Sequence, residues 1–513
     1  MFLILLVFLI ICLLLFDNYM KKRRRGWKEI SKFPGDTPIP LLGNIFQVGF
    51  DADDATNKLL AMWTRHGKQN FRLSNGFEHW IMLSEPDDIK TLLNDTNELA
   101  KPLERNAAMT PFFGKSVSTS EGQRWQFIRK LITPCFHFKS LQRTPEDLNE
   151  NINQVFDILD NFVGKDPVDM YTYFRPYMLD ILSNSLCGIE NDFLKNPEHS
   201  YLKASGKVIR IITYNFFSYW RNIYFLFRMT SMYTEMMDTI KELKRHSSDI
   251  ITKRRNELNK MIEKFKNDNN NVDINYDTFI ENKLSGSNLL DRLLLTKTPN
   301  GEQLTDDIIN EEIRLILFSG HYSTSITMSH AMYFLAKYPE IQKKVLEEQM
   351  LIFGKDFYNE ATIQQLNQMK YLEAVIKESM RNIPTIARIG RRLKRDMTFQ
   401  DGRVAPAGTT VIVFYDGVFR NPNIFEEPEK FKPERFLDPM HTYAFVPFSA
   451  GPRNCVAFRY AWVIMKVTLS RIIRRYNILP GGPGTEPKFA NRVITESTNG
   501  IQLRLTKRNL SQT

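Results

Sequence analysis

A cysteine in a turn near the end of the chain is the residue with the clearest chemistry. Residues 447–458 read PFSAGPRNCVAF, and they contain the pattern F-x-x-G-x-R-x-C, formed by Phe448, Gly451, Arg453 and Cys455. Glycine permits a turn that a side chain resists, and the apolar spacing that follows predicts a helix over 456–476. Unpaired amides at a helix start favour a thiolate, which suits an iron ligand. The alternative is an inert buried cysteine beside a surface arginine.

A tryptophan and an arginine share one face of a predicted helix earlier in the chain. Trp125 and Arg129 lie four residues apart in RWQFIRKLITPCFHF, so the indole N–H and the guanidinium point the same way. A ligand with two carboxylates would accept hydrogen bonds from both. Arg453, two residues before Cys455, is also placed to pair with an anionic group on whatever the sulfur binds. The alternative is an amphipathic helix with a packing tryptophan.

An acidic and a basic residue are three apart in KYLEAVIKESMRNIP, where Glu378 and Arg381 share a helix face and can form an ion pair. This spacing alone proves little, because it also occurs at Glu121 and Arg124, at Glu242 and Arg245, and at Glu311 and Arg314. What distinguishes the pair at 378 and 381 is the later sequence PERF at 433–436, just upstream of the cysteine loop.

The stretch PFSAGPRNC closely resembles the haem-binding loop of the cytochrome P-450 superfamily, and the resemblance extends over most of the chain. It implies a haem b cofactor with Cys455 as the axial thiolate ligand of the iron, in contact with Trp125, Arg129, Arg391, Phe448 and Arg453. It also implies a buried structural network behind the haem, formed by Glu378, Arg381 and Arg435. The family usually has glycine where this chain has Ala457, and one methyl group is not expected to prevent haem binding.

The most informative departure from the family pattern lies in a long apolar helix predicted over 311–339. The run SGHYST at 319–324 interrupts it, because a glycine and clustered hydroxyls weaken the helical ladder and predict a kink with room for dioxygen. The family usually has an acid and a threonine here, which deliver protons, whereas this chain has Tyr322 and Ser323. Tyrosine has a pKa of about 10 against about 3.9 for aspartate, so it is no simple substitute. The candidate catalytic residues are Tyr322, Ser323 and Thr324.

The sequence TPCFHF, at 133–138, and its surroundings resemble the membrane-bound branch of the family that includes fatty-acid ω-hydroxylases. This resemblance bears on Ser319, and His321 carries a separate expectation. That branch often has an acid, which attaches covalently to the haem, where this chain has Ser319; we therefore expect non-covalent haem. His321 is expected to be hydrogen-bonded inside the helical body, and a place in a proton path is the alternative.

The resemblance implies a haem-thiolate monooxygenase that hydroxylates lipophilic substrates, with fatty acids or related lipids as the class suggested by the branch. The implied partners are a flavoprotein, NADPH-cytochrome P-450 reductase, and cytochrome b5. Because Tyr322 and Ser323 replace the usual acid and threonine, two alternatives stay open. One is a haem-thiolate isomerase or dehydratase that rearranges peroxides, and the other is a haem-binding protein without turnover.

The elements that must position these residues are mostly helices. Helical periodicity dominates from residue 86 to 397, apart from a polar stretch at 266–277 that predicts a mobile surface loop. Strand-like segments with Asn-Gly or Asp-Gly turns lie at 71–83, 397–414 and 492–505. We therefore predict a mainly α protein with the P-450 fold, in which a large helical body carries a smaller, mostly antiparallel β portion in one interlocked domain.

The amino end predicts a membrane anchor. Residues 2–16 are all apolar and the basic run KKRRR follows at 21–25. As a helix, residues 2–20 span roughly 28 Å, close to the ~27 Å hydrocarbon core of the endoplasmic reticulum. Since the charge follows the apolar run, we expect a single-pass transmembrane signal-anchor over 1–20, with a cleaved signal peptide as the alternative. A basic, proline-rich hinge over 21–45 and a cytoplasmic catalytic domain over 46–513 complete the division.

Composition excludes several other classes of protein. The four cysteines are too scattered for a disulfide framework or a zinc site, and the eight histidines show no ligand pair at helical spacing. The formal charge of +11 includes the five charges of the basic run, and no interleaving of basic and aromatic residues predicts nucleic-acid binding. An acidic docking partner is compatible with this excess.

Overall fold

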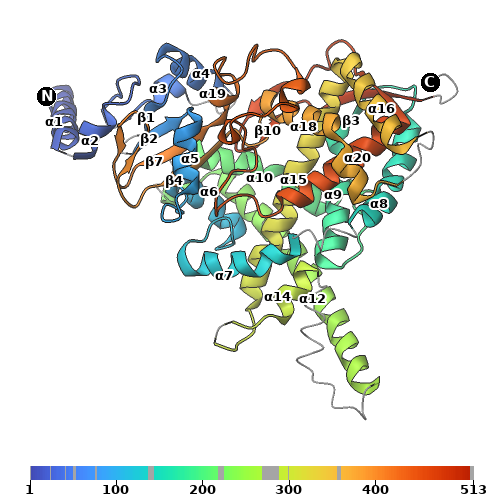
Figure 1. Ribbon diagram of the computed structural model, residues 1–513. Helices are drawn as coiled ribbons and strands as arrows, with labels where there is room; N and C mark the ends of the chain where they lie inside the picture. Colours follow the sequence, from blue (N-terminus) through green and yellow to red (C-terminus); the bar gives the residue numbers. More distant parts are fainter. Residues whose placement is uncertain are drawn as a thin grey trace.

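The computed structural model describes residues 2–23, 25–40, 42–49, 54–75, 78–136, 144–217, 224–268, 288–298, 300–354 and 360–508. Over these residues helices form most of the molecule, and the strands form small sheets, of which the one containing β1, β2, β7 and β4 lies at one side (Figure 1). This is the mainly helical class with a small β portion that the periodicity predicts. The stretch from 266 onward that predicts a mobile loop lies largely outside the described residues.

The elements follow the chain with these bounds. The α-helices are α1 (Phe2–Arg23), α2 (Arg25–Ile30), α3 (Ile45–Val48), α4 (Ala55–Arg65), α5 (Pro86–Asn94), α6 (Leu103–Phe113), α7 (Gly122–Ile132), α8 (Thr144–Leu159), α9 (Met170–Cys187), α10 (Ser200–Phe217), α11 (Tyr224–Arg228), α12 (Ser231–Asp268), α14 (Leu289–Leu295), α15 (Asp306–Lys337), α16 (Pro339–Phe353), α17 (Ile363–Gln368), α18 (Lys370–Asn382), α19 (Tyr415–Phe419) and α20 (Phe458–Arg475). Short 3-10 turns are η1 (Thr133–Phe136), η2 (Asp160–Phe162), η4 (Pro433–Phe436) and η5 (Thr442–Ala444). The strands are β1 (Phe71–Asn75), β2 (Glu78–Leu83), β3 (Val168–Asp169), β4 (Arg388–Arg392), β5 (Met397–Thr398), β6 (Val404–Ala405), β7 (Thr410–Phe414), β8 (Tyr476–Pro480), β9 (Phe489–Asn491), β10 (Thr495–Ser497) and β11 (Gln502–Lys507).

The largest sheet has four strands in the order β1-β2-β7-β4. The predicted hairpin over 71–83 is confirmed, because β1 pairs antiparallel with β2 and Asn75 stands opposite Glu78. The predicted segment 397–414 divides into the β5–β6 hairpin and β7, which runs parallel to β2 and antiparallel to β4. The sheet therefore joins segments more than 300 residues apart, as one interlocked domain requires.

The predicted strands and turn over 492–505 are present, but the two strands do not pair with each other as a hairpin. Gly500 has a φ of 76°, which glycine adopts readily, and the chain does turn there. The two flanking strands nevertheless enter different sheets: β10 pairs with β9, whereas β11 pairs with β8 and β3. The β11–β8 ladder is longer, from Leu503 opposite Pro480 to Lys507 opposite Tyr476, so a long-range pairing replaces the local one that the turn predicts.

Helix α15 forms the centre of the helical body and packs most extensively against α9, α18 and α12. Its residues are buried on almost every side, as expected for a helix inside a large core. The helix is not broken at 319–324, because α15 is continuous from Asp306 to Lys337, and the expected kink with room for dioxygen stays a prediction. Hydroxyls at 323 and 327 donate to carbonyls one turn back, at 2.8 and 2.9 Å, so they supplement the helical ladder without replacing it.

The amino end begins with α1, at the edge of the molecule beside the four-stranded sheet (Figure 1). Most of the apolar side chains described in α1 are exposed, Ile4 and Phe8 among them. The helix continues to Arg23, past the expected anchor boundary at residue 20. Among the residues that the structure describes, no helix combines the length and hydropathy needed to cross a membrane.

Candidate functional site

The cysteine loop is shaped by hydrogen bonds that fold it back on itself before α20. The Cys455 amide donates to the Phe448 carbonyl at 2.9 Å, and the Asn454 amide donates to the Gly451 carbonyl at 3.1 Å. Gly451 has a φ of 68°, and a side chain there would collide with the Leu93 carbonyl. Only glycine meets both conditions, which explains this position of the motif. Helix α20 begins at Phe458, two residues later than the sequence predicts.

The Cys455 sulfur is in a setting suited to a ligand. Its side chain is open to solvent, although the surrounding protein desolvates the thiol and raises its pKa. The Ala457 amide hydrogen-bonds to the sulfur and the Arg129 guanidinium lies near it, and both act to lower that pKa. An amide donor and a nearby cation stabilise a thiolate, as the position before a helix predicts. All four cysteines of the chain are free.

Basic side chains gather beside this loop and form what we call the cation cluster: Lys101, Arg105, Arg129, Arg391 and Arg453. Burial, together with repulsion from Arg391 and Arg105, lowers the pKa of Arg453 to about 9. Burial, and to a smaller extent repulsion from Arg391, lower the pKa of Arg105 to about 10. The pKa of Lys101 is lowered well below its usual range, by burial first and then by the four arginines. These residues therefore crowd positive charge into a poorly solvated place.

The cation cluster has no carboxylate in ion-pair contact within the described chain. Arg391 is 1% exposed; its Nη1 donates to the Gly390 carbonyl at 3.0 Å, while its buried Nη2 has no partner. Arg453 donates to the carbonyls of Ser120 and Ser118 at 2.9 and 3.5 Å. Buried guanidinium groups are ordinarily paired, so this arrangement fits an anionic ligand with several acceptor oxygens. The two carboxylates of a haem meet that description, and the sulfur beside them suits its iron.

The structure brings most of the residues predicted as cofactor contacts to this loop. The Arg453 guanidinium lies 4.6 Å from the Trp125 ring, and Trp125 is buried. Arg129 donates to the carbonyl and the side-chain oxygen of Asn454 at 2.8 and 2.6 Å, which ties α7 to the cysteine loop. The Phe448 ring packs against Phe458 and Trp462 of α20.

Lys101 and Arg105 belong to the same cluster and were missed by sequence reasoning. They lie in the sequence KPLER, which matches none of the motifs considered above. Arg105 binds the Ser118 carbonyl and hydroxyl at 3.0 and 2.7 Å. Because Arg453 also binds the Ser118 carbonyl, the segment between α6 and α7 holds two of the cations together.

The three candidate catalytic residues of α15 are placed differently from one another. Tyr322 is fully buried and donates to Oε2 of Glu496 at 2.7 Å. Burial is the main cause that raises its pKa, so the phenol is a very weak acid here. Ser323 is partly exposed and donates to the Ser319 carbonyl, and Thr324 is buried. The phenol proton of Tyr322 is therefore engaged within the protein.

His321 is hydrogen-bonded inside the helical body, as expected. It is fully buried, and its Nδ1 lies 2.7 Å from the Leu317 carbonyl one turn back. Burial lowers its pKa to about 4, so the ring is neutral near pH 7. A neutral imidazole with Nδ1 donating to a carbonyl has a bare Nε2 as its remaining acceptor.

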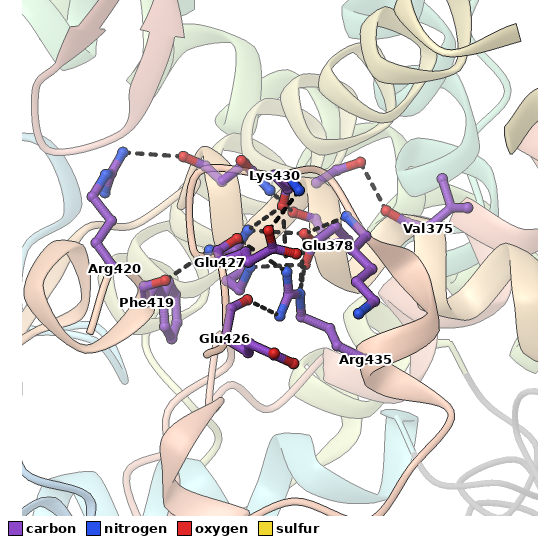
Figure 2. A network of polar contacts seen from close by, with 12 residues as sticks. Val375, Glu378, Phe419, Arg420, Glu426, Glu427, Lys430 and Arg435 are labelled. Carbon is purple, nitrogen blue, oxygen red and sulfur yellow. Dashed lines mark hydrogen bonds and ion pairs between the residues drawn. The ribbon is translucent and has the colours of Figure 1, made fainter. Parts of the chain in front are cut away.

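The network predicted from Glu378, Arg381 and Arg435 is present and buried, and Figure 2 shows Glu378 and Arg435 within it. Arg381 donates from Nε and Nη2 to the two oxygens of Glu378, both at 2.8 Å. Arg435 lies 3.3 Å from the same carboxylate and donates to the Glu426 carbonyl, and Arg381 also donates to the Phe419 carbonyl. Glu378, Arg381 and Arg435 are therefore hydrogen-bonded to one another or to carbonyls of the chain between α18 and η4, as a structural network requires.

The other segments with the same spacing form no comparable network. Glu242 and Arg245 form an ion pair on the surface of α12. In the remaining two segments the pairing crosses from one to the other: Arg124 forms an ion pair with Glu311 at 2.8 Å. Within the described chain, neither pairs with the residue three positions from it in its own segment. Spacing alone therefore predicted a pair in only two of the four places.

The fold and the site together define a class of protein: a helical protein whose accessible cysteine and cation cluster fit an anionic, metal-bearing macrocycle. The sequence model of the cytochrome P450 family matches residues 33–504, which is most of the chain. The chain therefore belongs to the cytochrome P450 family, whose members are oxidoreductases with a haem-thiolate cofactor.

Individual relatives agree with this assignment. Cytochrome P450 4d2 of Drosophila melanogaster is 31% identical over 504 residues, which cover 97% of this chain and 97% of the relative. Probable cytochrome P450 4e1 of the same species is 31% identical over 483 residues, 94% of this chain and 88% of the relative. Cytochrome P450 4e5, mitochondrial, of Drosophila mettleri is 31% identical over 445 residues, which cover 86% of this chain and 83% of the relative. All three carry the same family number, which confirms the resemblance to that branch.

Proposed function

We propose that this protein is a haem-thiolate monooxygenase in which Cys455 is the axial ligand of a haem b. The observation that carries the proposal is the cation cluster, which has no carboxylate counter-ion among the described residues and lies beside an accessible sulfur that accepts an amide hydrogen bond. Arg391 and Arg453 would pair with the haem carboxylates, with Arg129 and the Trp125 indole as further donors. Phe448 would pack beside the sulfur and exclude water from it.

When bound, a haem-thiolate supplies the capacity to activate dioxygen for insertion into an unreactive C–H bond. The residues of this chain orient the cofactor, shield the sulfur and exclude water. The Ala457 amide and Arg129 hold negative charge on the sulfur, because both stabilise the thiolate over the thiol. Ala457 stands where the family usually has glycine, and its amide still reaches the sulfur.

The substrate and partners follow from the branch that the chain resembles. We propose fatty acids or related lipids as substrates and NADPH-cytochrome P-450 reductase, with cytochrome b5, as the electron donors. A surface with excess positive charge suits docking of such acidic donors.

We propose the endoplasmic reticulum membrane as the location, with α1 as the segment that holds the protein there and the catalytic domain in the cytoplasm. The exposed apolar side chains of α1 and the basic run that follows support this. Alkaline carbonate extraction of the full chain, compared with a chain lacking residues 2–20, measures the attachment. Release of the full chain into the soluble fraction would contradict it.

A second candidate is favoured by α15. Tyr322 donates to Glu496 and Ser323 donates to the Ser319 carbonyl, so both hydroxyls have acceptors within the protein. An isomerase or dehydratase that rearranges lipid peroxides needs no proton delivery for O–O cleavage from an acid and alcohol pair. The arrangement of α15 is compatible with that reaction.

Two measurements on the purified holoprotein separate these candidates. A monooxygenase consumes oxygen in a reductase-dependent and NADPH-dependent way and forms a hydroxylated lipid. A peroxide isomerase or dehydratase converts a lipid hydroperoxide without NADPH and leaves oxygen consumption at background. Hydroperoxide conversion with no reductase-dependent oxygen uptake would overturn the monooxygenase proposal.

A further inference from the structure

One carboxylate joins the centre of α15 to two elements from other parts of the chain. The buried Tyr322 hydroxyl donates to Oε2 of Glu496 at 2.7 Å. Arg175 of α9 donates from Nη2 to the same oxygen at 2.8 Å. The carboxylate is therefore shared by α9, α15 and β10, which are far apart in sequence.

Arg175 is held between two tyrosine rings. Its guanidinium carbon lies 4.5 Å from the ring centroid of Tyr322 and 4.9 Å from that of Tyr171. Stacking on ring faces leaves the N–H edge of a guanidinium directed at an acceptor, here Glu496. Arg492 lies on the other side, with its Nη1 3.7 Å from Oε1 of Glu496. Both oxygens of the carboxylate thus face a cation, and Tyr322 completes the arrangement as a neutral donor.

Strand β10 has a second attachment that does not involve Glu496. The Ser497 amide donates to the Tyr171 hydroxyl at 3.1 Å. That hydroxyl lies 3.0 Å from Nε2 of His330, on α15. A substitution of Glu496 therefore leaves β10 fastened to both helices, and we expect such a variant to fold.

The neighbouring face of the same α15 turn is open. Ser319 is exposed and Ser323 is partly exposed, although Phe318 and Tyr322 beside them are buried. Successive residues of a helix are rigidly spaced around its axis, so fixing the Tyr322 ring also fixes the direction of these serines.

We propose that Glu496 is a positioning residue for the open face of α15. With Arg175 it holds Tyr322, and through Tyr322 it holds the Ser319–Ser323 turn in the orientation that leaves room for a ligand on the haem. The inference rests on the proposed haem site and names a residue, distant in sequence, that shapes it. In this proposal the role of Tyr322 is to fix the orientation of the Ser319–Ser323 turn.

The chain contains a matched control built from the same three groups. Tyr476 donates to Oδ1 of Asp160 at 2.6 Å, and Arg475 donates to Oδ2 of Asp160 at 2.6 Å. This second group joins η2 to the end of α20 and the start of β8, and it includes no residue of α15. Equivalent substitutions in the two groups each remove a tyrosine–carboxylate hydrogen bond, in one case at α15 and in the other away from it.

The test uses imidazole, which binds ferric haem on the side opposite the protein ligand and is titrated through the Soret absorption of the holoprotein. Glu496→Gln and Tyr322→Phe should each weaken imidazole binding by about fivefold, because the turn no longer keeps its open face clear. Asp160→Asn and Tyr476→Phe should leave the imidazole Kd within about twofold of the unmodified protein. Amide hydrogen exchange across 319–323 should accelerate in the first pair only.

Thermal unfolding of all four variants separates positioning from stability. Similar losses of Tm in both groups, with weaker imidazole binding only in the α15 group, support the proposal. An imidazole Kd that is unchanged or tighter in Glu496→Gln and Tyr322→Phe would overturn it, whatever their Tm. An unmodified protein with no imidazole-responsive Soret band would overturn the proposed function and this inference together.

Discussion

Two clusters of arginine in this molecule each contain buried guanidinium groups, Arg381 in one and Arg391 and Arg453 in the other, and they differ in what neutralises them. In the network of Glu378, every guanidinium has a carboxylate or carbonyl partner within the protein (Figure 2). In the cation cluster, Arg391 leaves a buried Nη2 without a partner, and no member forms an ion pair with a carboxylate of the described chain. The first cluster is complete when the chain folds, and we propose that a ligand completes the second.

The physical reason is the cost of burying charge. A buried ion that loses its partner keeps its desolvation penalty, so an incomplete cluster weakens the fold unless something else supplies the missing charge. In the ligand-free chain the cation cluster carries this desolvation penalty, and we expect an anionic cofactor to offset it. Substitutions in the two clusters should therefore have opposite consequences for the stability of the ligand-free protein.

The largest effect is expected at the complete network. Glu378→Gln removes the charge shared by Arg381 and Arg435 and should destabilise the fold by about 3–5 kcal/mol, because both guanidinium groups stay buried. Urea unfolding of the ligand-free protein measures this. The control is Glu242→Gln, which breaks a surface pair of the same spacing and should cost less than about 1 kcal/mol. Equal losses of unfolding free energy in the two variants would contradict the claim that burial makes the Glu378 ion pair more important than the surface pair.

A smaller effect of opposite sign is expected in the cation cluster. Arg391→Met removes a buried charge that has no partner, so the ligand-free protein should be as stable as the unmodified chain or more stable. Haem affinity should fall by about tenfold, because one charge-assisted hydrogen bond to the cofactor is lost. Haem titration and urea unfolding on the same preparation measure both. Arg395→Met, at an exposed arginine paired with Asp95, is the control. A variant that keeps its haem and loses stability would reverse the assignment of the cluster.

The smallest effect is expected from pH, through the acid that holds the segment beside the cluster. Burial raises the pKa of Glu312 to about 8 from its usual 4.5, and both its oxygens lie near the Val117 amide. The folded state therefore keeps a proton that the unfolded chain releases, so this contribution to stability is lost as pH rises from about 4.5 to about 8. Between pH 6 and pH 7 the loss should be about 1.3 kcal/mol, because the folded state holds nearly one more proton than the unfolded chain across this range.

Glu312→Gln tests this dependence directly. The amide cannot titrate, so the variant should lose less stability than the unmodified protein between pH 6 and pH 7 in urea unfolding. Val117 adjoins Ser118, whose carbonyl accepts from Arg105 and Arg453, so the measurement also reports on the support of the cation cluster. Parallel pH profiles in the two proteins would show that Glu312 is already ionised.

Sequence reasoning found the parts of the site that depend on local chemistry. The loop around Cys455 was predicted because Gly451 and Arg453 have roles that follow from their residue types and spacing. The network of Glu378 needed the additional PERF segment, since three other pairs have the same spacing. The helical body and the hairpin at 71–83 were predicted from periodicity and a turn.

The rest depended on contacts that no local pattern contains. Tyr322 was expected to face the chemistry, and its partner Glu496 is 174 residues away on a strand whose pairing with β9 the local turn did not predict. Lys101 and Arg105 were missed because they matter only through their proximity to Arg391 and Arg453. These residues are brought together by the fold and not by the sequence. Long-range pairing decides both cases.

The central claim is that the Cys455 sulfur binds haem iron as a thiolate, and the carbon monoxide difference spectrum of the reduced protein tests it most directly. The unmodified protein should show the long-wavelength Soret band of thiolate-ligated iron, and Cys455→Ser should lose that band. Cys135→Ser, at a buried cysteine whose pKa is raised by burial to about 11, is the control and should keep it. The thiolate band persisting in Cys455→Ser would contradict the account.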